Sequence, residues 1–196
     1  MITRTTTSLL EGLVDPANAE VWSAFDERFR PILFGFGRRL GLADEDAADA
    51  AQEALMRFVR SYRDGRYDRE RGRLSSWLLG IARNCIADVA SRNRARRERR
   101  GLSAVDDRVD DTVDRAWDEE CEREVLRRAL TRLREETRTE PRTIEAFELL
   151  ALGGRRPAEV ASMLDMSAND VYLAKHRCLG PMREFVEEIR AAYELD

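Results

Sequence analysis

Cysteine and histidine are scarce in this sequence, and their scarcity excludes several kinds of site. Its 196 residues include three cysteines, Cys85, Cys121 and Cys178, and none belongs to a CxxC pair or to a zinc-ligand spacing. An odd number of cysteines in dissimilar contexts predicts reduced thiols, and Cys85 and Cys178 occupy apolar helical positions where small buried side chains are expected. The one histidine, His176, cannot supply a metal site by itself. The sequence therefore predicts neither a metal ion nor a cofactor.

Long hydrophobic runs are also missing. The longest, at 77–79 and 147–152, fall far short of the roughly 20 residues that a membrane-spanning helix needs. Residues 1–10 hold one arginine and several threonines, but not the apolar core of about 7–15 residues that marks a secretory signal. We therefore expect a protein without a membrane span, located in the cytoplasm.

Catalytic motifs are absent as well. The sequence has no glycine-rich phosphate loop, no HExxH motif and no pair of ExxH motifs for a di-metal bundle. One histidine cannot serve a persuasive Ser/His/Asp set either. The sequence therefore predicts no enzymatic activity and no catalytic residues.

Charge is abundant, and it is segregated along the chain. Residues 61–100 hold 12 arginines against 5 acids, whereas residues 103–124 hold 10 acids against 3 arginines. A solvated helix face usually mixes the two signs at neighbouring helical positions. The clustering favours a nucleic-acid contact for the basic block over an ordinary solvated face, although the net charge of the chain is −4.

Apolar residues recur at helical spacing and strict alternation is not sustained, so the sequence predicts an all-α fold. The first half should form a bundle of three helices. They are expected from about 15 to 41, from about 44 to 62 and from 74 onwards, with a loop at 63–73 that contains Gly65 and Gly72. In the third helix, Trp77 and Ile81 are interpreted as core residues.

Apolar content collapses after Gly101, which predicts an acidic linker at 101–120 between two small helical domains, 1–100 and 121–196. The second domain should contain a helix around 125–133 and another that stops at Gly153 and Gly154. Two short helices follow: Pro157 opens the first, and Ser167 caps the second with Asp170 three residues on. This outline is that of a helix-turn-helix, and its geometry alone leaves open both DNA binding and a helical hairpin of the core.

Two runs in the first half resemble functional elements of a known protein family. The run ADAAQE at 48–53, followed by Leu55, Phe58 and Tyr62, resembles the helix by which sigma factors bind the clamp helices of the largest polymerase subunit. The run WLLGIARN at 77–84, together with Asp88 and Arg92, resembles the element that opens the minus-10 region of promoters. The resemblance covers 17–100 strongly and 122–187 more loosely. Since no middle domain intervenes, it points to the extracytoplasmic-function (ECF) group.

The resemblance implies two sets of functional residues in the first domain. A docking edge for core RNA polymerase would consist of Asp49, Gln52 and Glu53, because carboxylates on a rigid helix suit a clamp surface rich in arginine. Minus-10 recognition requires side chains that capture unstacked bases and hold phosphates. The residues expected to do so are Tyr67, Arg83, Asn84, Asp88, Arg92 and Arg96.

The recognition helix of the second domain departs from the family pattern. The family's usual Thr-Val-Lys-Ser-Arg is Asp-Val-Tyr-Leu-Ala here, at 170–174, and the cations are displaced to Lys175 and Arg177. The residues expected to contact minus-35 DNA are Arg156, Ser167, Asn169, Tyr172, Lys175, His176 and Arg177. By position, the acidic linker resembles the segment that family members thread toward the active-site cleft, and an RNA mimic and a solvated tether both explain its charge.

The hypothesis from sequence is thus an alternative sigma factor that binds core RNA polymerase and directs promoter recognition, DNA melting and transcription initiation. Its implied partners are promoter DNA, the clamp helices of the largest subunit and the flap of the second-largest subunit. Family members are commonly held by an anti-sigma factor, and the sequence leaves open whether this chain has one. The alternative is a helix-turn-helix regulator that binds duplex DNA without polymerase, and a polymerase-binding adaptor without promoter selectivity is a further rival.

Overall fold

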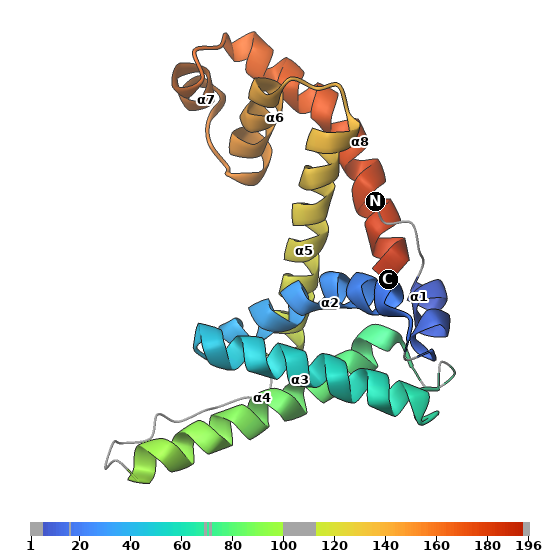
Figure 1. Ribbon diagram of the computed structural model, residues 1–196. Helices are drawn as coiled ribbons and strands as arrows, with labels where there is room; N and C mark the ends of the chain where they lie inside the picture. Colours follow the sequence, from blue (N-terminus) through green and yellow to red (C-terminus); the bar gives the residue numbers. More distant parts are fainter. Residues whose placement is uncertain (1–5, 16, 69, 71, 100–112, 194–196) are drawn as a thin grey trace. The chain divides into compact units, whose positions relative to one another are not determined.

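The computed structural model describes residues 6–15, 17–68, 70, 72–99 and 113–193. These residues form eight α-helices and one short π-helix and contain no strand, which confirms the predicted all-α fold (Figure 1). They divide into two compact units, which meet in the sequence between Glu124 and Val125.

The N-terminal unit begins with α1 (Thr6–Leu13) and α2 (Ala19–Arg39). The side chain of Asn18 caps α2 by accepting a hydrogen bond from the backbone N–H of Val21 at 3.2 Å. The buried face of α2 includes Phe25, Phe29, Leu33 and Phe36. After the helix ends, Gly41 adopts a φ of 88°, which is the left-handed conformation that glycine tolerates best.

Two further helices, α3 (Asp44–Arg63) and α4 (Leu74–Arg99), complete the predicted three-helix bundle. α3 packs against both α2 and α4. Small residues allow the close approach of α2, since a Cβ built on Gly37 would lie 3.2 Å from the Cβ of Ala47. The buried face of α4 includes Leu78, Ala82, Cys85 and Val89. Its outer face is thereby left for the polar residues that the sequence singled out.

The first half of α5 (Val113–Glu136) also belongs to the N-terminal unit. Trp117 is only 4% exposed, and its ring meets that of Phe36 edge-on at a centroid distance of 5.4 Å. Nearby, Arg39 Nε donates a hydrogen bond of 2.6 Å to the buried carboxylate of Glu120. A Cβ at residue 35 would meet that carboxylate, so a larger residue at this position of α2 would require the Glu120 side chain to shift.

The predicted linker at 101–120 therefore differs from the structure in its C-terminal part. Residues 113–120 are helical, and the rest of the linker lies outside the described residues. The signal was present in the sequence, because Val113, Ala116, Trp117 and Cys121 repeat at intervals of three and four residues, and all are buried. Acidic residues on the other faces of the helix dominated the composition and obscured this stripe.

The C-terminal unit contains the second half of α5, α6 (Pro141–Phe147), the π-helix η2 (Glu148–Leu152), α7 (Pro157–Met163) and, as far as Ala192, α8 (Ala168–Tyr193). Its small core is formed by Ala146, Val160, Val171 and Ala174. Pro157 stands in the first turn of α7, and the helix before it ends at Gly153 and Gly154, both as predicted. The last helix is not short, because α8 runs on through Pro181 to Tyr193.

All three cysteines are free and buried, in agreement with the prediction of reduced thiols. Burial raises the pKa of the Cys121 thiol to about 12 and also raises those of Cys85 and Cys178. The thiols therefore remain protonated at neutral pH and act as small hydrophobic side chains.

We predict that Trp117→Ala lowers the free energy of unfolding by about 3 kcal/mol or more, because replacing a large buried side chain by alanine leaves a cavity. Urea titration followed by circular dichroism would measure the loss. Trp22→Ala, which removes a half-buried tryptophan of α2, is the matched control and should cost less. Equal losses in the two variants would mean that the first half of α5 is not part of the folded unit.

Candidate functional site

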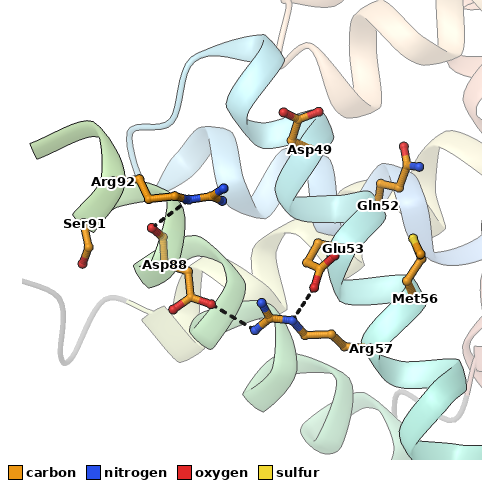
Figure 2. Close-up of a pocket in the computed structure, with 8 residues that line it drawn as sticks. All are labelled: Asp49, Gln52, Glu53, Met56, Arg57, Asp88, Ser91 and Arg92. Carbon is orange, nitrogen blue, oxygen red and sulfur yellow. Dashed lines mark hydrogen bonds and ion pairs between the residues drawn. The ribbon is translucent and has the colours of Figure 1, made fainter. Parts of the chain in front are cut away.

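A groove lies between α3 and α4 on the polar side of the N-terminal unit (Figure 2). It has a volume of about 720 Å³ and opens to solvent. Its lining residues, which define the α3–α4 groove, are Asp49, Gln52, Glu53, Met56, Arg57, Asp88, Ser91 and Arg92. The groove thus brings the whole predicted docking edge together with Asp88 and Arg92, which the sequence had assigned to DNA.

Arg57 forms an ion-pair bridge across this groove, and we call Arg57 with Glu53 and Asp88 the Arg57 bridge. Its Nε donates a hydrogen bond of 2.6 Å to Glu53 on α3, and its Nη1 donates one of 3.0 Å to Asp88 on α4. These two hydrogen bonds, that to Glu53 first, raise the pKa of the Arg57 guanidinium above its ordinary value. All three side chains are between 40% and 54% exposed, so each pair contributes at most about 1 kcal/mol to stability.

Only part of the predicted docking edge is left accessible by this bridge. Asp49 and Gln52 are exposed on α3, where a partner could approach them. Glu53 is half-buried and its carboxylate is engaged by Arg57. Met56, one turn from Gln52, is 43% exposed and gives the groove an apolar patch.

The predicted minus-10 residues lie along α4 and in the loop before it. Asn84 is exposed on α4. Arg83 is half-buried and lies 3.5 Å from Asp114 of α5, so its cationic head already has an acidic neighbour. Arg92 donates a hydrogen bond of 3.3 Å to the backbone carbonyl of Asp88 on its own helix. The side chain of Arg96 lies outside the described residues, as do those of the other arginines that end the basic run.

Tyr67 occupies the predicted loop and packs on the aromatic core of the unit. Its ring stacks on Trp77 at a centroid distance of 5.0 Å, and Trp77 in turn contacts Phe58 at 4.9 Å. The ring of Tyr62 lies 6.1 Å from Tyr67. This arrangement holds the loop to α4 and leaves Tyr67 half-buried, with part of its surface accessible for stacking.

The helix-turn-helix in the C-terminal unit consists of α7, a tight turn and α8. Asp165 turns the chain with a φ of 49°, and Met166 N donates to the carbonyl of Ala161 at 2.9 Å. Arg142 also donates hydrogen bonds to the backbone carbonyls of Leu164 and Asp165. These contacts fix the turn that separates the two helices.

The predicted capping box of α8 is present. The Ser167 hydroxyl accepts a hydrogen bond of 3.1 Å from Asp170 N and donates one of 2.6 Å to the Asp170 carboxylate. The first turns of α8 then present exposed side chains, namely Asn169, Tyr172, Lys175, His176 and Arg177. Arg156, at the start of α7, is paired with Glu159 at 2.7 Å. All the predicted minus-35 residues therefore lie in α8 or at the start of α7 or α8.

The sequence analysis missed two residues of the N-terminal site. Arg57 was not singled out, although its position four residues after Glu53 on a helix favours an ion pair. Asp114 was assigned to the linker, and nothing in the sequence relates it to Arg83. Only the packing of α5 on this unit brings the two together.

Residues 25–101 match the family model of sigma-70 region 2. The match supports a place in the sigma-70 superfamily. It includes α3, α4 and every lining residue of the α3–α4 groove. It covers less than half of the chain, and the helix-turn-helix lies beyond it. No curated protein matches the chain in a sequence comparison.

The described part of the chain holds neither a membrane-spanning helix nor a metal-binding cluster. No helix there is long and apolar enough to cross a membrane. Within the same residues, no three His, Cys, Asp or Glu side chains come together in a way that could hold a metal ion.

We predict that Asp170→Asn destabilises the protein at pH 7 and that the difference from the unchanged chain shrinks in acid. Hydrogen bonds from Ser167 hold the pKa of Asp170 below its ordinary value. The carboxylate therefore stabilises the fold above the ordinary pKa of about 4, and this contribution is lost as the pH falls through the lowered value.

Thermal unfolding measured from pH 7 down to about pH 2 would test this linkage. Asp165→Asn is the matched control, since that exposed residue has a left-handed conformation that asparagine also tolerates. A difference for Asp170→Asn that stays constant across this range would contradict the assigned role of the carboxylate.

Proposed function

We propose that the protein is an alternative sigma factor of the ECF type. It binds core RNA polymerase, recognises promoter DNA and directs its melting and the initiation of transcription. The observation that carries this proposal is the match of residues 25–101 to sigma-70 region 2, which spans the α3–α4 groove and the exposed face of α4.

Polymerase docking is assigned to the α3 side of the groove. Asp49 and Gln52 are exposed on a rigid helix, and the neighbouring Met56 adds apolar surface. A carboxylate, an amide and a thioether in a row suit a partner helix that carries arginine beside aliphatic residues. We assign this partner to the clamp helices of the largest polymerase subunit.

Promoter opening is assigned to α4 and the loop before it. Asn84 offers an amide to a base edge, and Arg83 offers a guanidinium plane. Tyr67 lies in the loop before α4, where its accessible part can stack against an unpaired base. Arg92 and Arg96 supply charge for the phosphates of the adjoining duplex.

The helix-turn-helix is assigned to duplex DNA at the minus-35 element. The exposed residues at the start of α8 are those that a recognition helix turns toward base edges, and Arg156 stands where it can meet a phosphate. The flap of the second-largest subunit is the expected polymerase partner of this unit. An anti-sigma factor that covers the same surfaces would keep the protein silent.

The alternative is a transcriptional regulator that binds duplex DNA through α8 without polymerase. The exposed polar side chains at the start of α8 favour it, because they need no polymerase to be accessible. This alternative does not explain the match to sigma-70 region 2.

Transcription in vitro discriminates between these functions. Purified protein is mixed with core RNA polymerase from the same source on the promoter region of its own gene. Initiation that depends on the protein would support the sigma factor, whereas core binding without initiation would favour an adaptor. DNA binding that needs no polymerase would favour the regulator.

We predict a division of labour between Asp49 and Asn84. Asp49→Ala should weaken core binding about tenfold, because it removes a charged hydrogen-bonding group from the docking surface. Asn84→Ala should leave core binding unchanged and impair open-complex formation.

The measurements are the dissociation constant for core polymerase and permanganate reactivity of the opened promoter. Glu27→Ala, which removes an acidic residue of α2 away from the groove, is the control for charge. Equal losses of core binding in the Asp49 and Asn84 variants would argue against separate surfaces.

A further inference from the structure

We infer that Arg57 is a positioning residue, which holds α4 against α3 by binding Glu53 and Asp88 at the same time. The inference rests on the proposed function, and it reassigns two predicted site residues. Glu53 and Asp88 serve Arg57, while direct contacts to polymerase and DNA belong to their exposed neighbours on the same helices.

The geometry of Arg57 is the first step. Its Nε and Nη1 groups donate to different carboxylates on different helices, at 2.6 Å and 3.0 Å. A planar guanidinium that donates from two positions in fixed directions constrains both acceptors more than a single contact would. Figure 2 shows the three side chains in line across the groove, with Arg57 in the middle.

A second tie joins the same two helices further along. Asn93 Nδ2 on α4 donates a hydrogen bond of 2.9 Å to the Asp46 carboxylate at the start of α3. In the sequence of α3, Asp46 and Arg57 bracket Asp49 and Gln52, the two exposed docking residues. The polar face of α3 is thus fixed to α4 at both ends of the docking edge.

The charges in the groove explain why an arginine is needed there. Asp49, Glu53 and Asp88 bring three carboxylates to its lining, and Arg57 stands between two of them. Without Arg57, the carboxylates of Glu53 and Asp88 would face each other across the groove and repel. Arg92 would remain as the one cation among the lining residues, and it is hydrogen-bonded to the backbone of its own helix.

Stability alone does not account for the arrangement. The side chains of the Arg57 bridge are substantially exposed, and ion pairs of this kind contribute little to the free energy of folding. The hydrogen bonds of the bridge fix the directions of the side chains more than they add to the free energy of folding. The groove is open, and these side chains make no buried contact with one another that would set the spacing of its polar walls. The bridge therefore matters most where the spacing matters, when a partner spans the groove or when Asn84 of α4 must meet an opened base.

A double-mutant cycle on core binding tests the role of Glu53. Arg57→Gln and Glu53→Gln should each weaken core binding about threefold to tenfold, and the double variant should bind no worse than Arg57→Gln alone. This result is expected because Glu53 acts through Arg57. If Glu53→Gln costs its full factor again in the Arg57→Gln background, Glu53 touches polymerase itself and the inference is overturned.

A second cycle tests Asp88 with DNA. The assembled holoenzyme is given a single-stranded minus-10 oligonucleotide of the non-template strand, so that duplex melting does not enter the measurement. Asp88→Asn and Arg57→Gln should each reduce retention of the oligonucleotide at saturating core, and their effects should not multiply. If the two losses of retention multiply in the double variant, Asp88 contacts DNA directly and the inference that it acts through Arg57 is overturned.

Two further variants separate positioning from a merely structural role. Arg57→Lys keeps the charge but loses the planar fork, so it should restore part of the affinity that Arg57→Gln loses. Arg30→Gln is the matched control. It breaks an ion pair of 2.6 Å between Arg30 and Asp26, which lies within α2 and does not join two helices, so core binding should be unchanged.

Thermal unfolding of each variant completes the test. Arg57→Gln should shift the melting temperature by less than about 5 °C, in keeping with exposed ion pairs. A much larger shift would show a structural role and overturn the inference. If the unchanged protein fails to bind core polymerase, the proposed function itself falls, whereas additive cycles in a protein that does bind core overturn only the positioning role.

Discussion

The N-terminal unit depends on the buried ring of Phe58. From α3 it contacts Phe25 of α2 and Trp77 of α4, each at a centroid distance of 4.9 Å, and it is fully buried. An aromatic ring of this size buries a large apolar area for a single residue and so contributes strongly to the core of a small helical domain. One ring thus joins three helices in the core, and the same contacts extend through Trp77 to Tyr67 in the loop before α4. The hydrophobic core and the loop before α4 are therefore joined by one cluster of aromatic rings.

The polar residues of the candidate site lie outside this aromatic cluster, at the surface of the unit. Apolar residues take the inner stripes of α3 and α4, so Asp49, Gln52 and Asn84 are left on the exposed faces of neighbouring helices. The Arg57 bridge joins these faces at the surface, where it adds direction and little stability. Contact residues that lie on two neighbouring helices need rigid backing of this kind to stay in place relative to one another.

Much of the fold could be predicted from the sequence, and the reasons are local. The helical spacing of apolar residues, the glycines that end helices and the Ser167 cap of α8 each act within a few residues, so their signals survive without tertiary context. The first half of α5 shows the limit of this approach. Its apolar residues are outnumbered by acids, and they form a helix that belongs to the folded unit because Phe36, Gly35 and Arg39 of α2 provide a complementary surface.

The sequence alone determined the residue types at the candidate site and the helices that carry them, because helical periodicity assigns each residue of α3 and α4 to an inner or an outer face. Only the tertiary structure decided which of these residues meet. It placed Asp88 beside Arg57 and Glu53, and it brought Asp114 to Arg83, across gaps in the sequence that no local rule spans. The physical reason is that side-chain partners on different helices depend on how the helices pack, and packing is set by the shape of the whole core.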